Sequence, residues 1–368
     1  MKKGVIIVAC LMLNVVAQAQ TGNYSEEIQA VDEYCPAPGQ FINTMPPYEA
    51  GDDAQTMAAK CTAYLASDDP YERGTVCLGA YGGYITFHFD HPIANVEGER
   101  DFIVYGNAFQ SMMFPNLAGG SSEPGIVMVS QDTNHNGKPD DIWYELSGSA
   151  DVDSAASVNS ALAWERRLIY NYQITYHRNG DLNPVPWTDN QGRSGQVNRM
   201  NKQNHTQEYW PLWISASTLT FSGTKLPKNA WLMHEQQEQQ GQGKQQWVLF
   251  FLRYGYVDGN KNANTEACSF DISWAVNPTT RESVTLKNID FVRVYTAMNQ
   301  SAGDLGETST EVAGAKDLHL AASIQAMNSG IVTEIATPVM QQQKVLYQMG
   351  NLQIVRRPNG EIRKQLKN

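Results

Sequence analysis

Residues 168–178, LIYNYQITYHR, alternate between apolar and polar side chains with a period of two. Such alternation is typical of a strand that buries one face and exposes the other. The segment therefore predicts a half-buried strand in which tyrosines form much of the buried face. The inward set is Leu168, Tyr170, Tyr172, Ile174 and Tyr176, and the outward set is Asn171, Gln173, Thr175 and His177.

The same period recurs along the chain. YITFHFDH, residues 84–91, places Ile85, Phe87 and Phe89 on one face, and SFDISWAV, residues 269–276, alternates in the same way. Strands separated by Gly, Asn and Pro, with few helices between them, indicate two packed sheets. We therefore expect an all-β, jelly-roll-like sandwich over residues 20–320, with two sub-domains as an alternative.

Four segments depart from the strand pattern. Residues 25–34 and 53–67 are predicted to be short N-terminal helices, and in the second Met57, Cys61 and Leu65 share one face. Residues 235–246, EQQEQQGQGKQQ, are predicted to be a mobile glutamine-rich loop. A change of composition near Ala321 starts a C-terminal tail over residues 321–368.

The first nineteen residues have the pattern of a signal peptide. Two lysines precede an apolar run, and Ala17-Gln18-Ala19 supplies small residues at a cleavage site. The alternative is a lipoprotein acylated at Cys10, because residues 7–10, IVAC, resemble a lipobox. No other stretch is apolar enough for a transmembrane helix. We expect export to the outer-membrane surface or the extracellular space, with the periplasm as an alternative.

The charge of the chain argues against nucleic acid as a partner. The formal net charge is −11, and removal of Lys2 and Lys3 with the leader would make it −13. Basic residues gather only in the last dozen positions, so no basic stripe crosses the predicted sandwich. Outside the leader, Cys35, Cys61, Cys77 and Cys268 allow two disulfides or none.

Residues 131–145, QDTNHNGKPDDIWYE, resemble a calcium loop. Hard cations require several oxygen ligands, and a glycine permits the sharp bend between them. The twelfth position of the loop is Trp143 instead of the expected glutamate, so Asp141 or Glu145 would have to supply the missing carboxylate. The alternative is an Asn136-Gly137 hairpin turn without metal. The predicted ligands of a structural calcium ion are Asp132, Asn134, Asn136, the carbonyl of Lys138 and Asp140.

Aromatic residues on two predicted loops form the candidate binding face. VPWTDNQGRSG and EYWPLW place indoles beside amides and an arginine, which suits stacking on a corrin ring or a sugar. The alternative is that these rings close the ends of the core. The predicted ligand-binding residues are Trp187, Asn190, Gln191, Arg193, Tyr209, Trp210 and Trp213.

Motifs of catalysis are missing from the sequence. The chain has no G-x-S-x-G, H-E-x-x-H or phosphate-binding P-loop. His88 and His91 in FHFDHP are expected to be solvated or hydrogen-bonded histidines and not metal ligands. We therefore predict no catalytic residue. A hydrolase acting on surface glycan or peptide is the alternative, and it would need two convergent carboxylates or an activated nucleophile.

Several segments between about Tyr34 and Leu320 resemble a family of exported cell-surface proteins of gut Bacteroidetes. The resemblance rests on VCLGAYGGYITFHFDHPI, DFIVYGNAF, SSEPGIVMVSQDTNHNGKPDDIWYELSGS, GTKL, DFVRVYTAMNQ and GDLGETSTEVAGAKDLHL. Members accompany TonB-dependent outer-membrane transporters and surface propeller proteins, including those of corrinoid (vitamin B12) uptake. The tail also resembles a truncated secretion-sorting segment.

The resemblance implies a β-rich binding protein for nutrient uptake with a small-molecule ligand. A corrinoid is the first expected ligand, and an outer-membrane transporter complex is an expected partner. A carbohydrate-binding module and an adhesin are the alternatives.

Overall fold

The repeated alternation of the sequence becomes a set of antiparallel sheets, which confirms the predicted all-β, sandwich-like fold. The computed structural model describes residues 23–66, 74–152, 168–180, 182–200, 207–236, 244–329, 344–349, 352–356 and 362–366. The predicted leader, with Cys10 and Ala19, lies outside these residues, as does the middle of the glutamine-rich insert. Within the described residues no helix is long and apolar enough to cross a membrane.

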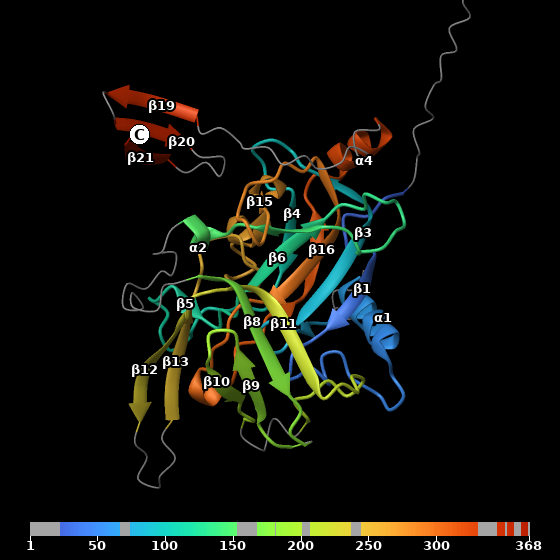
Figure 1. Cartoon of the computed structure of the whole chain (residues 1–368), viewed down its shortest axis with the longest axis vertical. Helices are drawn as coiled ribbons and strands as arrows, with labels where there is room; N and C mark the ends of the chain where they lie inside the picture. The colour runs from blue at the N-terminus through green and yellow to red at the C-terminus, as the bar shows by residue number, and fades with distance from the viewer. Residues whose placement is uncertain are drawn as a thin grey trace, which may run out of the picture.

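A six-stranded sheet forms the centre of the molecule, and its strands follow the order β1-β3-β16-β6-β7-β15 (Figure 1). The two central pairings, β3 with β16 and β16 with β6, are antiparallel throughout. The strands are β1 (Ala30–Cys35), β3 (Tyr84–Ala94), β16 (Asn288–Thr296), β6 (Gly125–Ser130), β7 (Trp143–Leu146) and β15 (Ala275–Val276).

One face of the central sheet packs on a layer of short strands and one helix. Ile85, Phe87 and Phe89 of β3 are buried there, as their alternation predicts. The layer contains β14 (Ser269–Phe270), β4 (Phe102–Tyr105), β18 (Gly314–Asp317), β2 (Val76–Cys77), β17 (Glu311–Val312) and α1 (Ala54–Leu65). Burial of these apolar surfaces is the main stabilising term for the fold.

Helix α1 confirms the predicted second helix. The carboxylate of Asp53 accepts a hydrogen bond from the amide of Thr56, which caps the first turn. Met57, Cys61 and Leu65 are fully buried on the face that the spacing predicts. The hydroxyl of Thr62 accepts a hydrogen bond from the amide of Val31, so the helix is joined to β1.

The first predicted helix, residues 25–34, is wrong. These residues enter β1, which pairs with β3 from Ala30↔His88 to Cys35↔Tyr84. The free edge of β3 supplies backbone hydrogen bonds to β1, and this tertiary pairing outweighs local helix propensity. The segment 269–276 is also not one strand, because the 3₁₀ turn η2 (Ile272–Trp274) separates β14 from β15.

A four-stranded sheet, in the order β10-β9-β8-β11, lies beside the central sheet (Figure 1). Gly82 permits close approach to it, because a Cβ at this positive-φ position would lie 2.2 Å from the Cβ of Phe221. Between the layers lies a second aromatic core. The strands are β8 (Ile169–His177), β9 (Val185–Asp189), β10 (Ser194–Val197) and β11 (Thr218–Lys225).

The quoted segment folds as predicted along most of its length. Tyr172, Ile174 and Tyr176 are fully buried, but Tyr170 is exposed. Asn171 adopts a positive φ of 53°, and the pairing of β8 with β11 shifts at the same place. This irregularity turns Tyr170 away from the core, so its predicted burial is wrong.

The remaining elements extend the sandwich. The glutamine-rich insert begins and ends in a hairpin, so its outer residues are strands and not loop. The helix α4 (Leu320–Asn328) packs on β3, where Ser323 accepts a hydrogen bond from the amide of Ala94. The other elements are α2 (Ser149–Val152), α3 (Thr265–Cys268), η3 (Gly303–Leu305), β5 (Gly119–Gly120), β12 (Ala230–Gln236), β13 (Lys244–Phe250), β19 (Lys344–Met349), β20 (Leu352–Arg356) and β21 (Ile362–Leu366).

The four cysteines outside the leader are free thiols. Burial raises the pKa of Cys35 to about 11 and that of Cys268 to about 12. Thiols with raised pKa values are poor nucleophiles, because little thiolate is present near neutral pH. The cysteines therefore contribute to packing and hydrogen bonding.

Candidate ligand-binding pocket

A cavity of about 450 Å³ lies between the β9–β10 hairpin and the residues that follow β16. We call it the hairpin pocket. Its volume is in the range of small-molecule sites. It is lined by Ala80, Trp187, Arg193, Ser194, Gln196, Val197, Asn198, Lys225, Lys228, Met298, Asn299, Gln300, Ser301 and Glu307.

The β9–β10 hairpin positions the aromatic wall of the pocket. Trp187 pairs with Gly195 across the hairpin. A Cβ on Gly195 would lie only 2.5 Å from the indole ring, so the ring can lie over this residue only because it is glycine. The indole is therefore held at the pocket wall by the strand opposite.

The turn of the hairpin positions Arg193. The carboxylate of Asp189 accepts hydrogen bonds from the amides of Gln191 and Arg193, and its second oxygen accepts from Nε of Arg193 at 2.8 Å. Gly192 supplies the positive φ that the turn needs. Backbone and side-chain contacts together lock the guanidinium against the hairpin.

Tyr172 lies between the cations of the pocket, Arg193 and Lys225, and the side-chain amide of Asn299. Its ring centroid lies 5.7 Å from the guanidinium carbon of Arg193 and 5.9 Å from Nζ of Lys225. Its hydroxyl donates to Asp189 and accepts from the amide nitrogen of Asn299, both at 2.9 Å. Two cations over one aromatic ring form a preorganised positive surface.

Glu307 is a buried acid at the pocket. Its carboxylate accepts hydrogen bonds from the backbone and side-chain amides of Gln40. Gly306, at a φ of 90°, permits this approach, because a Cβ there would lie 2.1 Å from Nε2 of Gln40. Burial raises the pKa of Glu307 to about 7. A large fraction of this carboxyl is therefore neutral near physiological pH.

The predicted binding residues separate into groups. Trp187 and Arg193 both line the hairpin pocket. Asn190 and Gln191 lie at the exposed turn, where Asn190 is bonded to the backbone of Asn171 and Gln173. They do not line the pocket, and their amides stabilise the hairpin instead.

Tyr209 and Trp210 are buried, with 1% and 2% of their surfaces exposed, so their prediction as exposed ligand-stacking residues is wrong. Asn43 donates to the carbonyl of Trp210, and the indole nitrogen donates to the carbonyl of Ile214. These bonds satisfy the carbonyl and the indole nitrogen of Trp210 in the interior, where the rings of Tyr209 and Trp210 belong to the second core.

Trp213 lies apart from the hairpin pocket. It stacks on Tyr34 and Tyr48, with ring centroids 5.5 Å and 6.2 Å away. It lines a second cavity of about 840 Å³ between β1, α1 and residues 213–216. The single aromatic platform predicted from sequence is therefore divided between two places.

The Asp132 loop connects β6 to β7 over residues 131–142. Positive φ angles occur at His135 and Gly137 but not at Asn136, so the predicted two-residue Asn-Gly turn is not formed. The carboxylate of Asp132 accepts from the amides of Asn136 and Gly137, and both asparagine side chains donate to Asp140. The side chains of Asp132, Asn134, Asn136 and Asp140 therefore all take part in the hydrogen bonds of this loop.

Asp141 and Glu145, the two candidates to replace the glutamate missing at position 143, lie in different places. Asp141 accepts a hydrogen bond from Thr133 within the loop. Glu145 is fully buried and paired with Arg281, so it does not face the loop. Of the two, only Asp141 belongs to the local set of oxygens.

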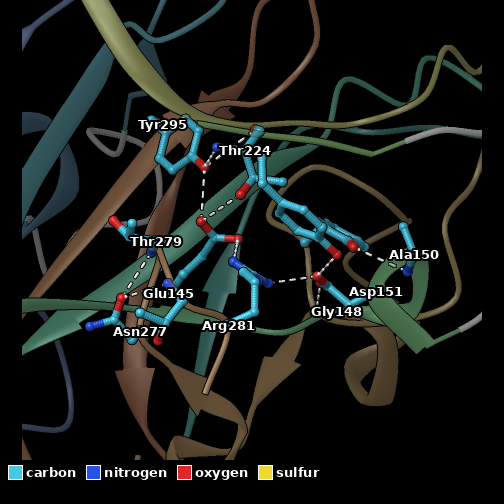
Figure 2. Close-up of polar contacts among 12 residues, drawn as sticks. Glu145, Gly148, Ala150, Asp151, Thr224, Asn277, Thr279, Arg281 and Tyr295 are labelled. Carbon is cyan, nitrogen blue, oxygen red and sulfur yellow. Dashed lines mark hydrogen bonds and ion pairs between the residues drawn. The ribbon is translucent and has the colours of Figure 1, made fainter. Parts of the chain in front are cut away.

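A largely buried ion network is centred on Arg281 (Figure 2). Its guanidinium lies 2.8 Å from Glu145 and 2.6 Å from Asp151. Glu145 also accepts from the hydroxyl of Thr224 at 2.9 Å and from that of Tyr295 at 3.4 Å. Burial raises the pKa of both acids, although the guanidinium opposes this effect. The contacts join β7, α2, β11 and β16.

A second acidic group contains Glu123, Asp258 and Glu311, whose carboxylate oxygens lie within 4.8 Å of one another. Burial raises the pKa of each well above its usual range, and their mutual repulsion adds to the shift. Asp258 accepts backbone hydrogen bonds from Asn107, Ala108 and Glu311. Carboxylates suit a hard cation, but these bonds already give the group a structural role.

Neither acidic group lines the hairpin pocket or the second cavity. His91 likewise is a hydrogen-bonded core residue, since its ring nitrogens contact Asp90 at 2.6 Å and Asp317 at 2.8 Å. His88 contacts Asp32. Both histidines of FHFDHP are therefore hydrogen-bonded to carboxylates, which agrees with the hydrogen-bonded histidines that the sequence predicts.

Sequence reasoning missed the lysines and the amide run of the hairpin pocket. Lys225 is the last residue of β11 and Lys228 lies just beyond it, and Asn299 and Gln300 follow the end of β16. Polar residues directly after strands are candidates for a site at a sheet edge. Their meeting point depends on the packing of two sheets, which a local pattern does not report.

Comparison with known proteins adds no assignment. No protein-family model matches the chain, and no curated protein shows significant similarity to it.

Proposed function

We propose that the protein is an exported, non-catalytic binding protein that captures a small-molecule nutrient in the hairpin pocket. The observation that carries the proposal is the convergence of Trp187, Arg193 and Asn299 on one cavity. An aromatic face, a cation and amides are the groups with which proteins bind polar organic ligands. Among the described residues that line the pocket, Glu307 is the one carboxylic acid, whereas hydrolysis of a glycan needs a pair of carboxyls.

A corrinoid is the first ligand under this proposal, because the resemblance of the sequence segments implies one. A whole corrin ring is larger than a cavity of about 450 Å³, so a peripheral group of the corrinoid would enter the hairpin pocket. The amide-rich lining suits such a group, since a corrinoid carries amide side chains. An outer-membrane transporter complex would then receive the ligand.

A glycan is the second ligand. The indole of Trp187 beside Asn198 and Gln196 is the observation that favours it, because sugar rings stack on indoles while amides bind their hydroxyls. The volume of the pocket suits one or two sugar rings. An adhesin that binds another protein would use a wider surface than this cavity.

The proposal includes a structural calcium ion at the Asp132 loop. The hydrogen bonds that Asp132, Asn134, Asn136 and Asp140 share within one loop support it. The Lys138 carbonyl accepts from the amide of Asp140 at 2.9 Å, so calcium would compete with that bond. The ion would hold the β6–β7 connection and take no part in ligand chemistry.

Isothermal titration with cyanocobalamin and with a glycan panel tests the function. We expect one of them to bind, and we expect Trp187→Ala to weaken that binding by about tenfold or more while leaving the melting temperature nearly unchanged. Trp143→Ala is the matched control, because Trp143 is also partly buried but stacks on Arg293 outside both cavities. Absence of binding to every compound, or equal losses in both variants, would contradict the proposal.

A further inference from the structure

The hairpin pocket concentrates positive charge in an acidic protein. The chain has a formal net charge of −11, yet among the residues that the structure describes this pocket is lined by three cationic side chains and one acidic side chain. The cations are Arg193, Lys225 and Lys228, and the acid is Glu307. A positive local field in an otherwise negative protein attracts anionic ligands to the pocket.

The guanidinium of Arg193 has more hydrogen-bond donors than the one that its ion pair with Asp189 uses. Among the described residues, its side-chain hydrogen bond to Asp189 uses Nε. The two terminal amino groups belong to a side chain that is 48% exposed and lines the pocket. Paired N–H groups of a guanidinium match the spacing of two oxygens on a carboxylate or a phosphate.

We infer that the ligand of the hairpin pocket carries an anionic group, a phosphate or a carboxylate, which Arg193 binds with support from Lys225 and Lys228. This inference rests on the proposed function, because it specifies the chemistry of the same pocket. Trp187 and Met298 supply the apolar surface for the rest of the ligand. The anionic group is thus held at the Tyr172 side and the organic part at the indole side.

Glu307 is compatible with an anion in the pocket. Its carboxylate accepts hydrogen bonds from Gln40, which orient it within the protein. Because burial raises its pKa to about 7, its repulsion of an anion is weakened at and below neutral pH. Glu307 therefore opposes an anion at the guanidinium of Arg193 less than an ordinary carboxylate would.

The test uses inorganic phosphate and acetate as probes for the two anionic groups. Binding of each to the full chain is measured by ligand-observed NMR at constant ionic strength. We expect saturable binding of at least one probe, and we expect Arg193→Met to weaken it about tenfold. Arg193→Lys keeps the charge without the paired donors and should show an intermediate loss.

Arg178→Met is the matched control, because Arg178 lies just after β8 and does not line the pocket. It should leave the affinity unchanged, and circular dichroism of each variant should show an intact fold. Failure of both probes to bind the unmodified protein would overturn the inference, as would equal binding by Arg193→Met. A neutral compound that binds in the titrations while both anions fail would leave the proposed function standing. Anion binding without any hit among cyanocobalamin and the glycans would support the inference alone.

Discussion

At the scale of single residues, the environment of an indole decides its role. Trp187 lies over Gly195 at the wall of a cavity, whereas Trp210 is almost fully buried with its nitrogen bonded to Ile214. In the sequence each indole lies next to a proline, with Pro186 before Trp187 and Pro211 after Trp210. The difference arises because Asn43 reaches the backbone of residues 208–212 and draws that segment inward.

The Asp132 loop leads to a prediction about calcium. If the oxygens of this loop bind the ion, calcium should stabilise the folded protein by roughly 2.7 kcal/mol at a hundredfold excess over the dissociation constant. Asp132→Ala should abolish this gain, because it removes a carboxylate that faces the loop. Thermal unfolding with calcium and with a chelator measures the effect.

The control for this experiment is Lys138→Ala, which keeps the backbone carbonyl predicted to bind the ion. It should retain the calcium-dependent gain. A melting temperature that calcium leaves unchanged in the unmodified protein would show that the loop is held by its own hydrogen bonds alone.

At the scale of elements, a buried ion network joins strands that are distant in sequence. Arg281 lies between Glu145 of β7 and Asp151 of α2, and its guanidinium also lies 4.5 Å from the ring of Tyr170. The exposed position of Tyr170 after the irregularity in β8 makes this contact possible. The outward position of Tyr170 thus adds a contact between β8 and the ion network of Arg281.

Arg281→Met should therefore destabilise the protein by about 3–5 kcal/mol, because it leaves two buried carboxyls without their cation. The loss should be smaller at acidic pH, where Glu145 and Asp151 can bind protons. The double variant Arg281→Met/Glu145→Gln should recover part of the stability. Urea unfolding at two pH values measures these differences, and a loss independent of pH would contradict the role of the carboxyls.

At the scale of the whole molecule, buried acids should control the pH dependence of stability. Burial raises the pKa of Asp101 and Glu307 to about 7 and that of Asp290 to about 6. Ordinary values in an unfolded chain are about 4. Between these values the folded protein binds more protons than the unfolded chain, so the free energy of unfolding should fall as pH rises.

We expect the melting temperature to decrease between about pH 4 and about pH 7. Asp290→Asn should reduce the slope below about pH 6, because Asp290 no longer titrates and an amide oxygen can still accept from the amide of Asp132. Asp290→Glu keeps a titratable group and serves as the control. A melting temperature that rises from about pH 4 to about pH 7 would contradict the role of these buried acids.

The sequence by itself determined the class of fold and several local elements. Alternation specified the buried faces of β3 and most of β8, and Asp53 with the spacing of Met57, Cys61 and Leu65 specified α1. These features are local, because the period of a strand or helix and the cap of a helix depend on near neighbours. Trp187 and Arg193 were also identified locally, since a turn and its flanking strands present them together.

The tertiary structure alone decided the rest. It placed residues 30–34 of the predicted helix 25–34 in the edge strand β1, because β3 offered an unpaired edge. It buried Tyr209 and Trp210, and it brought Lys225 and Glu307 to the pocket of Trp187 from other parts of the sequence. Such contacts depend on how sheets pack, and packing is a property of the whole chain that no short pattern contains.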